Sequence, residues 1–183
     1  MVLEHLLSQK RAPILERWFG LILDTYPADS SRFFKQEKDR FANPVGYTIS
    51  LEIETLFDEL LHGMNPAKLS ASLDNIIRIR AVQDFSPSQA VAFVFLLKKA
   101  VREELESKIR KNQLFEELLK FESRIDELAL RAVNIYMGCR EKIYETRVNE
   151  VKAERERVFK LLERTNPRYD KLEKKRKLKD RET

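Results

Sequence analysis

Two histidines and a Glu-x-x-His pair are the residues of this chain that come closest to a metal site. Neither His5 nor His62 has a second histidine three or four residues away, so no helix can present two imidazole ligands to a metal. Glu59 and His62 form the pair, but a di-iron bundle needs it twice, with further carboxylates. His62 lies where a helix is expected to end, and an imidazole there favours the helix dipole. We therefore expect no metal, no cofactor and no catalytic residue.

Cys139 is the only cysteine, which excludes an internal disulfide and any site with several cysteine ligands. It can be a small buried apolar residue, or a redox switch if two copies of the chain pair at this position. The sequence also has no glycine-rich phosphate loop, no Walker pattern and no nucleophile elbow. These observations predict a protein that is not an enzyme.

Aromatic side chains are the candidates for binding an apolar ligand. At helical spacing such residues more often form an ordinary core, so a ligand cavity and plain packing both remain open. The candidate cavity residues are Trp18, Phe57, Phe93, Phe95 and Phe121, with Phe33, Phe34 and Phe115 as further aromatic candidates.

Positive charge is concentrated at the C-terminal end. The formal net charge is +5, and residues 146–183 hold 14 Lys and Arg against 8 Asp and Glu, so the preceding residues are close to neutral. A basic tail can attract nucleic acid or another anionic surface, or can simply keep a helix end soluble. The candidate anion-binding residues are Lys174, Lys175, Arg176, Lys177 and Lys179. Without helix-turn-helix spacing, we expect any nucleic-acid binding to be weak and salt-sensitive.

The composition predicts an all-helical protein. Of the 183 residues, 43% are apolar, which allows a buried core, while only 4 Gly and 6 Pro leave few tight turns and disfavour an all-β fold. No stretch approaches the ~20 apolar residues of a membrane span, and the N-terminus lacks the order of a secretion signal. We expect a cytoplasmic protein with no membrane span.

Helix-start signals divide much of the chain. Asn43-Pro44 and Asn65-Pro66 each place an N-cap residue before a proline suited to the first helical position. Ser86 and Gln89 have the spacing of a capping box. Gly63 can take left-handed backbone at the end of the helix that begins at Asn43.

Apolar spacing supplies the remaining helices, about six in all. Apolar residues recur at steps of three and four from Leu3 to Leu23, where Pro13 separates or kinks the segment. A short helix is expected over 30–41. After Asn65 the apolar face runs through Leu69, Leu73, Ile76 and Ile77, and continues at Arg80.

The last helix is the longest and carries two apolar stripes. The first alternates steps of four and three, as in a coiled-coil heptad, and consists of Leu114, Leu118, Phe121, Ile125, Leu128, Ala132, Ile135 and Cys139. The second is offset near Gly138, by a stutter or a local bend, and consists of Tyr144, Val148, Val151, Arg155, Val158 and Leu162.

A helix from Asn112 to Arg164 would be about 80 Å long at 1.5 Å per residue. A body of 140 residues is only about 30 Å across, so we expect the distal half to project and to need a partner. A second copy is the simplest partner and predicts a homodimer; an unknown protein is the other candidate. The candidate partner-facing residues are Ile135, Cys139, Tyr144, Val148, Val151, Val158 and Leu162. The predicted organisation is a body over 1–140, a coiled-coil-like extension over 141–165 and a disordered basic tail over 166–183.

Two motifs resemble a known family. Arg40 to Gly46 reads RFANPVG, and Arg80 to Ala90 reads RAVQDFSPSQA. Both lie within longer similar segments over 14–27, 39–64 and 69–105. Together with the long closing helix, they resemble the N-terminal domain of the RsbRD type, found in bacterial RsbT co-antagonist proteins of the stressosome. The resemblance covers residues 1–140.

The resemblance implies a globin-like helical sensor domain that binds no haem, dimerises and signals through a connecting helix. The helix over 69–80 would lie near the proximal position of such a fold, and it contains no histidine. The residues after 140 are too few for the STAS domain that follows this region in the family, so output through STAS is not carried over. We predict a non-enzymatic bacterial regulatory or sensory module acting through its last helix. The alternative is a nucleic-acid or anionic-surface binder acting through the basic tail.

Overall fold

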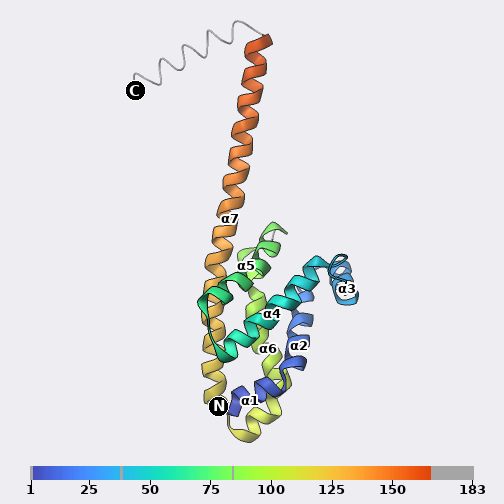
Figure 1. Ribbon diagram of the computed structural model, residues 1–183, viewed down its shortest axis with the longest axis vertical. Coiled ribbons are helices and arrows are strands. Elements are labelled where there is room, and N and C mark those ends of the chain that lie inside the picture. The colour runs from blue at the N-terminus through green and yellow to red at the C-terminus, as the bar shows by residue number, and fades with distance from the viewer. Residues whose placement is uncertain (1, 38, 84, 166–183) are drawn as a thin grey trace, which may run out of the picture. The chain divides into compact units, whose positions relative to one another are not determined.

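The computed structural model describes residues 2–37, 39–83 and 85–165. Within these ranges the protein is all-helical, with seven helices and no strand (Figure 1). The helices are α1 (Val2–Gln9), α2 (Arg11–Leu23), α3 (Ala28–Gln36), α4 (Pro44–His62), α5 (Pro66–Val82), α6 (Pro87–Asn112) and α7 (Phe115–Thr165). The predicted all-helical class and the long last helix are confirmed.

The first expected helix is two helices, which raises the number from six to seven. The break falls at Lys10, between α1 and α2. Pro13 lies in the first turn of α2, where its missing N–H has no intrahelical partner to lose. The proline therefore marks the start of α2 rather than a kink within one long helix.

The predicted helix starts are confirmed by their hydrogen bonds. Asn43 Oδ1 accepts from the Gly46 N–H at 2.8 Å, and a Cβ at position 46 would collide with the Asn43 side chain. The Asn65 side chain accepts from two N–H groups of the first turn of α5. Ser86 and Gln89 form both bonds of the capping box at the start of α6. Each of these ends is thus fixed by a local side chain.

Three helix ends differ from the sequence prediction. Helix α3 ends at Gln36, before Phe41. Gly63 has φ −137°, and it is Met64, with φ 48°, that takes the left-handed conformation, because Glu59 holds the Met64 and Asn65 N–H groups. Gln113, with φ 54°, separates α6 from α7, so the last helix begins at Phe115. Met64 and Gln113 take left-handed backbone although neither is a glycine, so the sequence gives no signal for the helix ends at these two positions.

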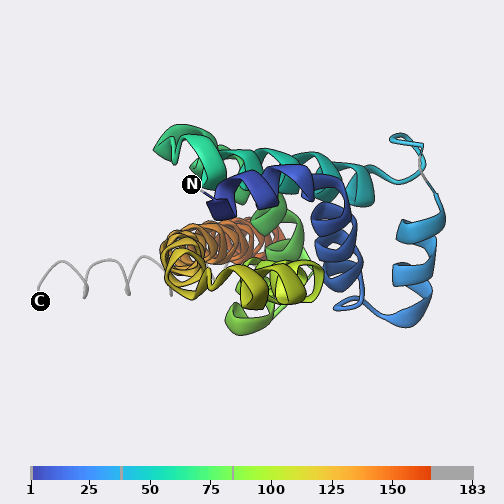
Figure 2. The same ribbon diagram turned by 90° about the horizontal axis from the view of Figure 1, so that it is seen from below.

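Two compact units divide the chain after Arg140. In the first unit, α4 packs along α5 and α2 packs along α6 (Figures 1 and 2). The first α7 stripe closes this core, since it is buried from Leu114 to Ala132. Glu122 of α7, itself 6% exposed, accepts from Arg102 of α6 at 2.7 and 2.8 Å. Both packing and a two-bond ion pair therefore hold this part of α7 to α6.

Helix α7 is assigned through Gly138 to Thr165. Residues 141–165 form its part in the second unit, and most of their described side chains are exposed. None of the helices in the described ranges is long and apolar enough to cross a membrane.

Candidate functional site

A fully buried arginine is the most unusual polar group of the first unit. Arg80 lies near the end of α5 with 0% of its surface exposed. Its Nη2 donates to Thr25 Oγ1 at 2.9 Å and to the Gln89 carbonyl at 3.1 Å. Arg80 thereby joins three places in the chain: the end of α5, the segment after α2 and the first turn of α6.

Three aromatic rings surround the Arg80 guanidinium. Its Cζ lies 4.3 Å from the centroid of the Phe85 ring, 5.2 Å from that of Tyr26 and 5.8 Å from that of Phe93. Tyr26 also packs edge-on against Phe34 and Phe85, with centroids 5.4 and 5.2 Å apart. Ring faces attract the positive charge, by about 2 kcal/mol for a desolvated contact.

Hydrogen bonding at this site is incomplete. Within the described part of the chain, Nε and Nη1 of Arg80 and the hydroxyl of Tyr26 are buried without a hydrogen-bond partner. Burial lowers the pKa of Arg80, partly offset by Tyr26, and burial raises the pKa of Tyr26. An arginine nevertheless stays protonated in proteins. The site therefore holds a buried positive charge, which costs several kcal/mol unless it is neutralised.

The other buried charged residues in the described ranges are paired. Glu122 binds Arg102, and Glu59 Oε1 lies 2.8 Å from Lys68 Nζ. The bond to Lys68 is the largest cause that lowers the pKa of Glu59. The same Glu59 holds the Asn65 N–H, so the Glu-x-x-His pair is anchored in the loop between α4 and α5. Arg80 is the exception to a pattern of satisfied buried charges.

The Arg80 site touches α7 through Phe85. The Tyr136 hydroxyl donates to the Phe85 carbonyl at 2.7 Å, and Arg140 Nη1 donates to the Ala81 carbonyl at 3.3 Å. Cys139 Sγ lies 4.0 Å from Asp74 Oδ1 of α5. One turn of α7 is thus bonded to the end of α5 and the loop that follows it.

The predicted cavity residues do not all lie together. Trp18, Phe57 and Phe93 are 0% exposed and Phe121 is buried, whereas Phe95 is 46% exposed. Trp18 Nε1 donates to the Phe93 carbonyl at 2.7 Å, which satisfies the indole. Phe93 is the one member of this set that contacts the Arg80 site. The existence of a ligand cavity among them stays a prediction.

The predicted partner-facing residues fall into two groups. Ile135 and Cys139 are half-buried in the first unit. In the second unit, Tyr144, Val148, Val151 and Val158 are 53%, 50%, 65% and 49% exposed, and Leu162 is half-buried. The tail residues Lys174, Lys175, Arg176, Lys177 and Lys179 lie outside the described residues.

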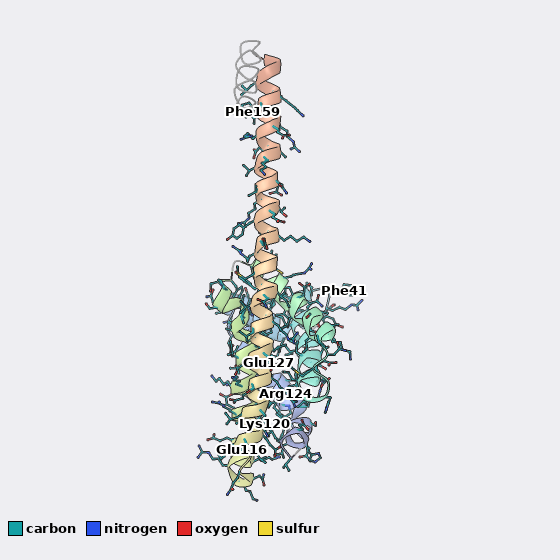
Figure 3. The ribbon with its side chains drawn as sticks, turned by 90° about the vertical axis from the view of Figure 1, so that its left-hand side faces the viewer. Phe41, Glu116, Lys120, Arg124, Glu127 and Phe159 are labelled. Atoms are coloured by element: carbon teal, nitrogen blue, oxygen red, sulfur yellow. The ribbon has the colours of Figure 1, made fainter. Side chains whose placement is uncertain are left out.

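The part of α7 in the first unit carries both polar and apolar side chains outside the core. Figure 3 labels four polar ones, Glu116, Lys120, Arg124 and Glu127, of which Arg124 donates to the Leu60 carbonyl of α4 at 3.0 Å. Among the apolar ones, Leu119, Leu130 and Met137 are 63%, 69% and 57% exposed. In the sequence Leu130, Met137, Tyr144, Val151 and Val158 are seven residues apart, the repeat of a coiled-coil heptad. The exposed apolar spacing thus begins two repeats before Tyr144, where the sequence analysis placed its start.

In the described ranges, no group of three or more His, Cys, Asp and Glu side chains is placed to hold a metal ion. His62 is exposed and Glu59 is committed to Lys68 and Asn65. The sequence analysis missed Arg80 as a site, although its place on the apolar face of α5 was the signal.

Comparison with known proteins identifies the family of the chain. The model of the RsbT co-antagonist protein RsbRD N-terminal domain matches residues 12–151. A protein of Archaeoglobus fulgidus, described as an uncharacterized protein, is 27% identical over 159 residues, which cover 84% of this chain and 92% of that protein. No solved structure matches the chain. The motif from Arg80 to Ala90 supplies Arg80, Phe85 and the Gln89 carbonyl of the buried site. The chain belongs to the RsbRD N-terminal domain family, a family of stressosome-related regulatory domains.

Proposed function

We propose that the chain is a non-enzymatic sensory module that forms a homodimer through the exposed apolar face of α7 and signals or docks a partner protein through this long helix. The observation that carries this proposal is the exposure of apolar residues at heptad spacing, with Val151 at 65% and Val158 at 49%. Regularly spaced exposed apolar side chains on a helix are costly in water and are typical of a face that pairs with another helix.

A second copy of the chain suits this face because a heptad repeat is self-complementary. Identical helices with the same repeat can place knobs into each other's holes without a second gene product. Arg155 interrupts the second stripe, but its guanidinium lies 5.9 Å from the Phe159 ring centroid of the same helix. The charge therefore has a local contact that leaves Val151 and Val158 available for packing.

Light scattering on the full chain tests the dimer. The wild type is expected to show twice the 21.7 kDa mass of one chain, and the double variant V151K/V158K the mass of one. V82K is the matched control, because Val82 is 72% exposed at the end of α5. A wild type that stays monomeric at high micromolar concentration contradicts the proposal, as does a double variant that stays dimeric.

A further inference from the structure

We propose that the Arg80 site binds a compact monovalent anion, with the chemistry of a chloride ion or a carboxylate group. The observation is the juxtaposition of a fully buried guanidinium that has two nitrogens, Nε and Nη1, without a partner and a buried Tyr26 hydroxyl without a partner. This inference goes beyond the proposed dimer, since it concerns the interior of the first unit.

The groups left without a partner select for negative charge. The Nε and Nη1 groups of Arg80 can only donate, and the Tyr26 hydroxyl is able to donate as well. A neutral acceptor would satisfy these donors but would leave the buried charge in place, whereas an anion does both. The nearest acidic side chain on the same segment as Tyr26, Asp24, already binds Lys35 at 2.6 Å.

The surroundings favour a small ion with one charge. The rings of Tyr26, Phe85 and Phe93 surround the guanidinium and leave one formal positive charge at the site. A phosphate or sulfate dianion would bring a second negative charge into this apolar environment without a second cation to meet it. A halide or a carboxylate balances the charge of Arg80.

Tyr26 also connects the site with the surface. It is 7% exposed and lines an open depression of about 430 Å³ together with Asp24, Ala28, Ser31, Arg32 and Lys35. Asp24 pairs with Lys35, so Arg32 supplies the net positive charge of this depression, which raises the local concentration of anions. Tyr26 thus belongs both to the rings around Arg80 and to the lining of this surface depression.

Thermal unfolding of the full chain tests the proposal, with chloride and acetate each compared at constant ionic strength against the anion of HEPES, a bulky sulfonate without a carboxylate. An anion that binds only the folded state raises the melting temperature, by about 3 °C when it is present at ten times its dissociation constant. R80M is expected to abolish this rise, and Y26F to reduce it. R78M is the matched control, because Arg78 lies on the same helix with 66% of its side chain exposed and should keep the full rise.

If R80M does not fold, a direct measurement of anion binding to the wild type still tests the proposal. Chloride NMR line broadening by the wild type should be reversed by acetate, which shows that both anions share one site, and should weaken in Y26F. Acetate that stabilises the protein without displacing chloride would contradict a shared site. A wild type that shows neither broadening nor a chloride-dependent melting temperature overturns the proposal and leaves a buried water as the partner. Asp84, the residue before Phe85 in the sequence, supplies one more variant. A response that appears only in D84N also overturns the proposal, because the counter-ion would then be a carboxylate of the chain itself.

Discussion

The two parts of α7 share a heptad spacing but differ in exposure. Ile125 and Leu128 of the first unit are 0% exposed, whereas Val148 and Val151 of the second unit are 50% and 65% exposed. Periodicity therefore shows which residues share a face of a helix but not what covers that face. A face covered by the same chain stabilises the fold, and an exposed face contributes only when another molecule covers it.

The largest expected effect comes from truncating the covered face. L128A removes three heavy atoms from a fully buried side chain and should lower the free energy of unfolding by about 2–5 kcal/mol. V151A, measured by urea unfolding on dilute monomer, should change it by less than about 0.5 kcal/mol. If the two truncations lowered the free energy of unfolding equally, the difference in exposure between the two parts of α7 would not affect stability.

An intermediate effect is expected from the ion pair that ties α7 to α6. R102M leaves the Glu122 carboxylate, 6% exposed, without the two bonds at 2.7 and 2.8 Å, and should cost about 1–3 kcal/mol in urea unfolding. R110M breaks an exposed pair with Glu106, whose side chains are 72% and 63% exposed, and should cost less than about 0.5 kcal/mol. If R110M proves as costly as R102M, burial of Glu122 is not the cause.

A smaller effect is expected where α7 meets the loop of the buried site. Y136F removes the bond from the Tyr136 hydroxyl to the Phe85 carbonyl and should cost about 0.5–1.5 kcal/mol in the same assay. Y47F is the control, since Tyr47 is 45% exposed on α4. If Y136F is neutral while Y47F is costly, this bond does not fasten α7 to the loop.

Much of the fold could be predicted because its signals are local. Asn43, Asn65 and Ser86 each cap a helix through bonds to their own first turn, so neighbouring residues specify these ends. The break at Lys10 has a nearby signal in Pro13, which lies in the first turn of α2, whereas the break at Gln113 has no neighbouring Gly or Pro.

The candidate site was less predictable than the fold. The step from Ile77 to Arg80 placed the arginine on the inner face of α5, but its orphaned N–H groups depend on residues brought together from three segments. No pattern of neighbouring residues in the sequence indicates that these three segments lie together in the fold. The sequence predicted the exposed apolar residues from Tyr144 onward. It did not predict Leu130 and Met137, because in that part of the helix the buried stripe gives the clearer apolar pattern.

The smallest expected effect depends on pH and concerns the start of α7. The Leu3 N–H donates to Glu117 Oε2 at 2.9 Å, and this bond is the largest cause that holds the pKa of Glu117 below its ordinary value. A carboxyl whose pKa is lower in the folded state stabilises the fold above its unfolded pKa, about 4.3, and loses that contribution as the pH falls through the folded pKa. E117Q should therefore have a lower melting temperature than the wild type at pH 7, and the gap should close in acid. E116Q, at the exposed neighbouring position, should follow the wild type at every pH. A gap for E117Q that stays constant from pH 7 to pH 3 would assign the effect to shape and packing rather than to the charge that joins α1 to the covered part of α7.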